Sequence, residues 1–273
     1  MSQQGFEAAV MRAKEYIAAG EIYQVNLSQC FSTTTSATDL YALYQQLRAA
    51  SPAPMACYGK LGGRELLCSS PETFMRLSGQ VAETRPIKGT SPRHPHPDDD
   101  ACSAAELLAS PKERAELVMI TDLLRNDLGM VCEYGSVQVD ALLTLESLAQ
   151  VHHLVSTVRG TLRPEVDHLA ALRATLPGGS ITGAPKIRAM EVIRELEPVP
   201  RGLYTGVVGY LGFAGESQFN IVIRSIMREA QRLSYHVGAG IVADSCPTRE
   251  YEETLVKARG IRRALDQSLL NHG

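Results

Sequence analysis

The stretch Glu21–Phe31, "EIYQVNLSQCF", contains the alternation that decides the fold. Side chains of an extended chain point alternately to its two faces, so this stretch sorts into an apolar set and a polar set. These sets are Tyr23, Val25 and Leu27 against Gln24, Asn26 and Ser28. The pattern predicts a strand with one apolar face. It leaves open whether the polar face meets solvent or a site.

The segments around this strand alternate between helices and blocks of strands. Helical spacing and caps predict helices at Phe6–Ala19, Asp100–Ala109 and Lys112–Leu124, from near Pro185, and at Thr248–Leu270. Further strands are expected at Met55–Lys60, Glu65–Ser69, Phe74–Leu77, Gln80–Glu83, Ser136–Leu145, Leu154–Leu162, Thr205–Phe213, Phe219–Met227 and Arg232–Ala239. Strands that come in blocks between helices indicate an α+β class with mainly antiparallel β-sheets.

Composition narrows the class of protein. The 273 residues can enclose one large domain, and we expect a single domain over residues 1–273. The formal net charge of −3 argues against a general nucleic-acid or membrane partner. The chain has no apolar run of the roughly 18 residues that a membrane span needs, and no secretory signal pattern. Its six cysteines are scattered without a CxxC pair, which is typical of a reduced, cytoplasmic protein.

Two pairs of glutamates are spaced to share helix faces. Glu113 and Glu116 are three residues apart, and Glu250 and Glu253 repeat this spacing in the last helix. One such pair is usually a solvated surface. Two pairs that faced each other would require a hard divalent cation, and Mg²⁺ fits because it takes few carboxylates. The sequence does not show that the pairs face each other.

A second set of residues suits an anionic small molecule. Lys257 lies one helical turn after Glu253. Arg224, in "FNIVIRSIM", is either on a surface-facing strand position or buried against an anion. Gly238 and Gly240, in "HVGAGIVADS", allow backbone N–H groups to approach a carboxylate. Without a third glycine, this pattern is a weak dinucleotide signal.

Three further residues are candidates for chemistry, although each has an ordinary structural interpretation. Glu72, in "CSSPETF", occupies a turn and acts as a general acid only if it is partly buried. His153, in "VHHLVST", starts a strand, where a lone histidine is more often structural. Lys88, in "RPIKGT", reads as a solvated loop lysine unless its surroundings make it reactive.

Ten motifs in chain order carry a family resemblance. They are "EIYQVNLSQ", "SSPE", "RPIKGT", "DLLRNDLG", "HHLVSTVRG", "GGSITGAPKIRAMEVI", "GLYTGVVGY", "FNIVIRS", "GAGIVADS" and "EYEETLVKA". Together they resemble the catalytic region of the chorismate-utilising enzymes, from about Phe6 to Leu265. The resemblance implies an α+β fold of packed antiparallel sheets flanked by helices, Mg²⁺ as cofactor and chorismate as substrate.

The resemblance also implies a role for individual residues. Glu116 and Glu253 match the principal Mg²⁺ ligands, and Glu113 and Glu250 the supporting carboxylates. The residues matching the substrate-binding positions are Arg224, Tyr204, Gly240, Lys257, Gly89 and Thr90. Glu72 matches the general acid that assists loss of the ring 4-hydroxyl, and His153 matches a histidine close to the ring.

Two positions distinguish the branches of the family. Isochorismate and salicylate synthases resemble one another in a lysine where this chain has Gln24, and an amide is a poor general base. The anthranilate branch typically has alanine where this chain has Lys88. The chain therefore looks most like the aminodeoxychorismate branch. There the lysine attacks ring C2 as the 4-hydroxyl leaves, and ammonia then adds at C4 and expels the lysine.

That branch implies amination of chorismate to 4-amino-4-deoxychorismate, for para-aminobenzoate and folate biosynthesis, with ammonia from a separate glutamine amidotransferase subunit. The alternatives are anthranilate synthase component I activity and an inactive chorismate-binding or subunit-interaction module. The usual N-terminal region of the family has no counterpart in these 273 residues.

Overall fold

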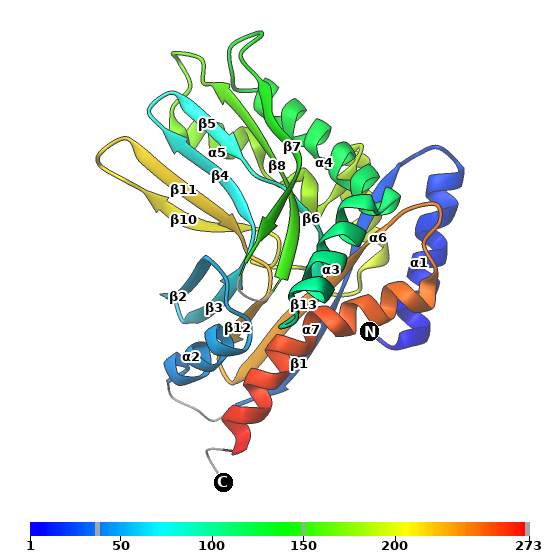
Figure 1. The fold of residues 1–273 in the computed structure, drawn as a ribbon. Helices are drawn as coiled ribbons and strands as arrows, with labels where there is room; N and C mark the ends of the chain where they lie inside the picture. The colour runs from blue at the N-terminus through cyan, green and yellow to red at the C-terminus, as the bar shows by residue number, and fades with distance from the viewer. Residues whose placement is uncertain (36–38, 149–150, 271–273) are drawn as a thin grey trace. The chain divides into compact units, whose positions relative to one another are not determined.

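The computed structural model describes residues 1–35, 39–148 and 151–270, which form two compact units. Unit 1 combines Met1–Pro71, Ile181–Val207 and Ile221–Gly273, and unit 2 combines Glu72–Ser180 and Val208–Asn220. Each unit contains a mainly antiparallel sheet with helices against it, which confirms the predicted α+β class (Figure 1). Over the described residues, no helix is both long and apolar enough to span a membrane.

The sheet of unit 1 has the strand order β2-β3-β12-β13-β1-β9. Its strands are β1 (Gln24–Thr34), β2 (Met55–Leu61), β3 (Arg64–Ser70), β9 (Gly183–Ala184), β12 (Ser225–Glu229) and β13 (Arg232–Ile241). The longest pairing joins β1 to β13 in antiparallel register, from Val25 opposite Ile241 to Thr34 opposite Arg232. This pairing joins the two longest strands of the sheet.

The helices of unit 1 cover the apolar face of this sheet. They are α1 (Gln3–Ala18), α2 (Tyr41–Ala50), α6 (Lys186–Leu196) and α7 (Pro247–Leu270). Val25 and Leu27 of β1 pack with Phe6 of α1, and Leu67 of β3 packs with Ile261 of α7 in a second cluster. The position of α7 is thereby fixed by its contacts with α1, α2 and β13 (Figure 1).

The sheet of unit 2 has the order β10-β11-β4-β5-β8-β6, and β7 also pairs with β8. Its strands are β4 (Thr73–Ser78), β5 (Val81–Thr84), β6 (Ile87–Pro92), β7 (Gln138–Ser147), β8 (Val151–Thr161), β10 (Val207–Leu211) and β11 (Glu216–Ile221). The helices are α3 (Pro97–Ala109), α4 (Pro111–Gly129) and α5 (His168–Thr175), and a short 3₁₀ turn, η1, spans Gly179–Ile181. Helix α4 packs against β6, β7 and β8 (Figure 1).

Most predicted elements are confirmed, but the expected strand Phe219–Met227 is wrong. Strand β11 ends at Ile221 in the sheet of unit 2, and β12 begins at Ser225 in the sheet of unit 1. Between them Arg224 adopts a φ of +47°, which interrupts an extended chain. Helices α2 and α5 and strand β6 were not anticipated from the sequence.

Both faces of β1 are largely buried in its first half. Gln24 and Ser28, on the polar face, are 0% and 3% exposed, so this part of the face is shielded from solvent. Tyr23, which the alternation grouped with the apolar side chains, precedes β1 and is 71% exposed. This part of the polar face therefore lies inside the molecule and requires hydrogen-bond partners.

A buried ion pair binds backbone groups of β1 on the edge of the strand that faces β9. Glu197 and Arg201 lie 2.6 Å apart, with side chains 5% and 13% exposed. The backbone N–H of Ser28 donates to Glu197 over 2.7 Å, and Arg201 donates to the carbonyl of Asn26 over 2.6 Å. The ion pair thus continues the hydrogen bonding of β1 beyond the two-residue strand β9.

Replacing one partner of this pair should therefore destabilise unit 1. Arg201→Met leaves the Glu197 carboxylate buried without its counterion, so we expect unfolding free energy to fall by about 3–5 kcal/mol. Arg64→Met is the matched control, because Arg64 pairs with Glu229 where both side chains are more than half exposed. It should cost less than about 1 kcal/mol. Equal urea midpoints for the two variants, followed by circular dichroism, would contradict the structural role of Arg201.

Candidate active site

Lys88 lies on strand β6 of unit 2, and the expectation of a loop lysine is wrong. Strand β6 pairs with β8, and their register shifts between Lys88 and Thr90, where Gly89 has a φ of +72°. This β-bulge re-aims the neighbouring side chain. The ammonium of Lys88 lies 3.9 Å from the Glu116 carboxylate, and the two side chains are 18% and 14% exposed. Lys88 is therefore a largely buried cation that faces a carboxylate.

Glu113 and Glu116 both face β6 from helix α4. The helix begins after Ser110, whose hydroxyl accepts from the Glu113 N–H over 3.4 Å. A Cβ at Gly89 would lie 3.0 Å from the Glu113 carboxylate, so a larger residue would collide with it. The helical spacing of Glu113 and Glu116 therefore brings both carboxylates to the β6 bulge, as the i,i+3 pattern predicts for one face.

His153 joins the same group from strand β8. It is 5% exposed, and its Nδ1 lies 2.9 Å from the hydroxyl of Thr90 on β6. The side chain of the neighbouring His152 points to the opposite face of the strand, because adjacent strand residues alternate between faces. Its Nε2 lies 3.0 Å from the Asp100 carboxylate. A hydrogen bond from Arg93 holds the pKa of Asp100 well below its usual range. The contact of His152 with Asp100 was not predicted from the sequence, although the paired histidines were the available signal.

Unit 2 thus brings together one set of predicted residues, here called the β6–α4 group: Lys88, Gly89, Thr90, Glu113, Glu116 and His153. Glu72 belongs to the same unit. It lies in the turn between β3 and β4, as predicted, and is 9% exposed. This burial meets the condition set for a general acid.

Unit 1 holds a second set of predicted residues on helix α7. The hydroxyl of Ser245 donates to Glu250 over 2.7 Å, and Glu250 is 4% exposed. Glu253 forms a 2.7 Å ion pair with Lys257, one turn later. Lys257 also donates to the Gly238 carbonyl over 3.0 Å, which ties this face of α7 to β13.

Tyr204 is a predicted substrate-binding residue of unit 1. Its ring stacks on His236 with the centroids 5.0 Å apart. Burial raises the pKa of Tyr204 to about 12 and lowers that of His236 to about 4, so both are neutral near pH 7. His236 was not predicted from the sequence as a site residue. Its position two residues before Gly238, on the same strand face, was the available signal.

Gly240 lies on the buried polar face, opposite Asn26 of β1. A Cβ there would lie 2.7 Å from the amide nitrogen of Gln24. Within the described residues, neither polar atom of the buried Gln24 amide has a hydrogen-bond partner. Arg224 is partly buried, and its carbonyl accepts from the Ser69 N–H over 3.2 Å. A buried amide without partners marks a place where a polar ligand or water completes the structure.

The four predicted metal ligands are thus divided, two carboxylates to each unit. No group of three or more His, Cys, Asp or Glu residues placed to hold a metal ion was found in the described part of the chain. Carboxylate pairs are nevertheless suitable donors for Mg²⁺, which binds one or two carboxylates and keeps several waters. The donor chemistry of each pair therefore fits the expected ion.

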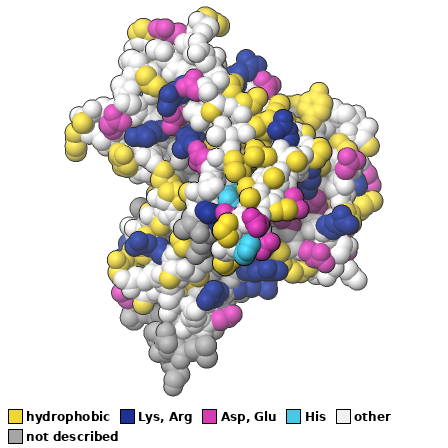
Figure 2. Space-filling model, viewed as in Figure 1, with side chains coloured by type: hydrophobic (Ala, Val, Ile, Leu, Met, Phe, Trp, Pro, Cys, Tyr) yellow, Lys and Arg dark blue, Asp and Glu magenta, His cyan; other side chains and the backbone are white. Residues whose placement is uncertain are grey.

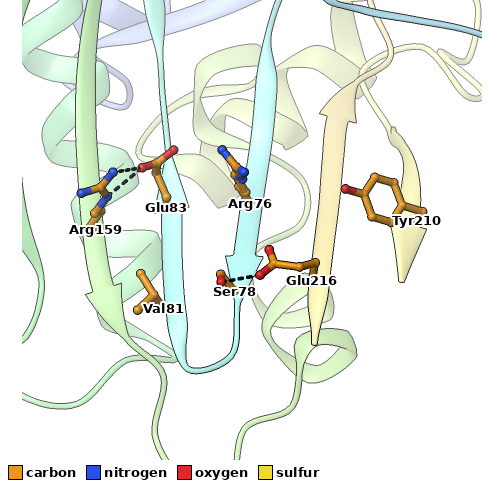
Figure 3. A pocket seen from close by; sticks show the side chains of 7 residues that line it. All are labelled: Arg76, Ser78, Val81, Glu83, Arg159, Tyr210 and Glu216. Carbon is orange, nitrogen blue, oxygen red and sulfur yellow. Dashed lines mark hydrogen bonds and ion pairs between the residues drawn. The ribbon is translucent and has the colours of Figure 1, made fainter. Parts of the chain in front are cut away.

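A surface hollow in unit 2 has a volume of about 430 Å³ (Figure 3). None of the residues that line it belongs to the β6–α4 group. It is lined by Arg76, Ser78, Val81, Glu83, Arg159, Tyr210 and Glu216. Arg159 is engaged by Glu83 at 2.6 Å, and Ser78 donates to Glu216 over 2.6 Å. Acidic and basic side chains are also intermingled over the face drawn in Figure 2. None of the lining residues is a predicted site residue.

Comparison with known proteins places the chain in a family. The family model described as chorismate binding enzyme matches residues 1–263. Aminodeoxychorismate synthase component 1 of Bacillus subtilis is 45% identical over 98% of this chain and 57% of its own length. Anthranilate synthase component 1 of Synechocystis is 47% identical over 96% of this chain and 54% of its own length.

The solved structure of anthranilate synthase component I from Streptococcus pneumoniae is 38% identical, with a TM-score of 0.86 over 95% of this chain and 57% of that one. The chain therefore spans about half the length of the relatives that it matches. Its matched length and its similarity to these relatives show that the chain belongs to the family of chorismate binding enzymes.

Proposed function

We propose that this chain aminates chorismate at C4 to give 4-amino-4-deoxychorismate, with Lys88 as the nucleophile. The observation that carries the proposal is the placement of Lys88, largely buried on β6 and facing Glu116. A solvated surface lysine would have neither the burial nor the bulge that directs it. The B. subtilis relative, which has the corresponding name, supports the assignment.

The β6–α4 group and Glu72 account for the bond changes at the ring. The Lys88 ammonium first releases a proton to solvent. The resulting amine attacks C2, the ring double bond shifts, and the C4–O bond breaks. Glu72 donates a proton to the departing hydroxyl, which leaves as water. Ammonia then attacks C4, the double bond shifts back, and the C2–N bond to Lys88 breaks. His153, oriented by Thr90, lies in the same group and helps to position the ring.

The residues of unit 1 account for binding of the substrate carboxylates. Arg224 and Lys257 supply positive charge, and Tyr204 supplies a neutral hydroxyl donor because its pKa is raised to about 12. The absence of a side chain at Gly240 leaves room for the buried Gln24 amide against β13, and this amide would donate to a carboxylate oxygen next to the Gly240 backbone. Each glutamate pair, Glu113 with Glu116 and Glu250 with Glu253, would supply carboxylates to Mg²⁺, and the ion would neutralise carboxylate charge on the substrate.

Anthranilate formation is the second candidate, because relatives with that name are as similar to the chain as the aminodeoxychorismate synthase is. It requires amination at C2 and loss of pyruvate, for which Lys88 has no role. In either case we expect a glutamine amidotransferase subunit to supply ammonia, and the product of C4 amination would enter para-aminobenzoate and folate synthesis. Incubation with chorismate, ammonia and Mg²⁺, followed by product analysis, separates these activities from an inactive module.

We expect Mg²⁺ dependence to require both glutamate pairs. Glu116→Gln and Glu253→Gln each remove one charge from a pair and should raise the Mg²⁺ concentration for half-maximal activity on the order of 100-fold, about 3 kcal/mol. Glu252→Gln is the matched control, because Glu252 is exposed on α7 beside Glu253. A Mg²⁺ titration that is unchanged in both variants would remove the proposed metal site.

Lys88→Ala should change the product rather than the fold. The variant loses the covalent route to 4-amino-4-deoxychorismate, and ammonia can attack C2 in the vacated space, so 2-amino products should appear. Lys112→Ala, at an exposed position of α4, should keep the wild-type product profile. Chromatography with mass detection reads both products. A folded Lys88→Ala protein that makes 4-amino-4-deoxychorismate at the wild-type rate would return Lys88 to a structural role.

A further inference from the structure

Two of the six cysteines lie opposite each other in the sheet of unit 1. Cys57 on β2 and Cys68 on β3 are register partners in an antiparallel pair. Directly opposed residues of such a pair point to the same face, with Cβ atoms about 4.5–5.5 Å apart. A disulfide requires Cβ atoms about 3.5–4.5 Å apart, so only a small adjustment of the two strands is needed.

The two thiols already contact each other through a side-chain hydrogen bond. This bond lowers the pKa of Cys57, and together with burial it raises the pKa of Cys68. Cys57 is partly exposed on β2, which lies at one edge of the sheet, whereas Cys68 is buried behind it. The outer thiol is therefore the more reactive one, and the inner thiol is held next to it.

The other cysteines that lie in described strand pairings are not opposite a cysteine. Cys30 lies opposite His236, and Cys132 forms a bridge to Leu162. Cys102 and Cys246 are exposed, and Cys102 donates to Glu106. The arrangement of Cys57 and Cys68 is thus not a general property of the thiols in this chain, and the exposed cysteines are natural controls.

We propose that Cys57 and Cys68 are a redox-active pair that hydrogen peroxide converts to a cross-strand disulfide. The Cys57 thiolate attacks a peroxide oxygen, the O–O bond breaks, and the sulfenic acid forms with release of hydroxide, which is protonated to water. The Cys68 sulfur then attacks the Cys57 sulfur, and the S–O bond breaks as a second water leaves. Two thiols and one peroxide give one disulfide and two waters.

Peptide mass spectrometry of the folded full chain tests the pair without reference to catalysis. The protein is treated with stoichiometric peroxide, its remaining thiols are alkylated under denaturing conditions, and it is digested with trypsin. Cleavage after Arg48, Lys60, Arg64 and Arg76 places Cys57 in peptide 49–60 and Cys68 in peptide 65–76. A disulfide joins these two peptides and is detected as their combined mass less two hydrogens.

Wild type should lose two of its six free thiols and yield the linked peptides, and dithiothreitol should restore both. Cys57→Ala should give no linked peptides, and Cys102→Ala should give them as wild type does. The proposal is overturned if wild type keeps peptides 49–60 and 65–76 separately alkylated while the exposed cysteines oxidise. It is equally overturned if the link forms only in concentrated urea, because folded-strand register would then have no part in it.

Discussion

The Glu197–Arg201 ion pair satisfies the edge of β1 at the point where the neighbouring strand has ended. Strand β9 pairs with Gln24 and Val25 only, and the carboxylate and guanidinium then bind the backbone of Ser28 and Asn26. Arg201 also donates to the Ile181 carbonyl over 2.9 Å. A buried ion pair is tolerated when such hydrogen bonds surround it. The segment after α6 therefore acts in place of a strand, and it delivers Tyr204 to His236.

Both units use a glycine where a polar side chain presses against the backbone of a strand. In unit 2, Gly89 allows Glu113 of α4 to approach the β6 bulge beside Lys88. In unit 1, Gly240 allows the Gln24 amide to lie against β13. A Cβ at either position would occupy the space that these side chains need. In both sets of predicted site residues, a glycine thus leaves room for a polar side chain against a strand, although the two sets belong to different sheets.

Much of this arrangement could be predicted from local patterns. Helical spacing correctly placed Glu113 with Glu116 on one face of α4, because a helix turns through the same angle at every residue. Alternation correctly gave the strand character of β1. The apolar run Phe219–Met227 was wrongly predicted to be one strand. Its alternation is the same for one continuous strand as for two consecutive strands that belong to different sheets. Only long-range pairing, Phe219 with Met75 and Met227 with Leu66, separates these possibilities.

Lys88 shows the same limit. Its segment is short and flanked by prolines, so the sequence pattern did not indicate the strand β6. The contact of Lys88 with Glu116 depends on how α4 packs on the sheet. The burial of Gln24 and Ser28 could not be predicted from the pattern either, because alternation shows that the two faces of a strand differ but not what covers each face. Family resemblance supplied candidate roles for these residues, and the structure supplies the contacts within each unit.

The interleaving of the two units in the chain has a consequence for synthesis on the ribosome. Unit 2 has all of its residues once residue 220 has emerged, whereas unit 1 begins at Met1 and still lacks β12, β13 and α7. Strand β1 must therefore wait for β13, its partner from nearly the other end of the chain. Pairings so distant in sequence form slowly, and the waiting segment exposes apolar residues such as Phe6 and Val25. The order of translation thus leaves the N-terminal segment of unit 1 without its partner strand until β13 has been made.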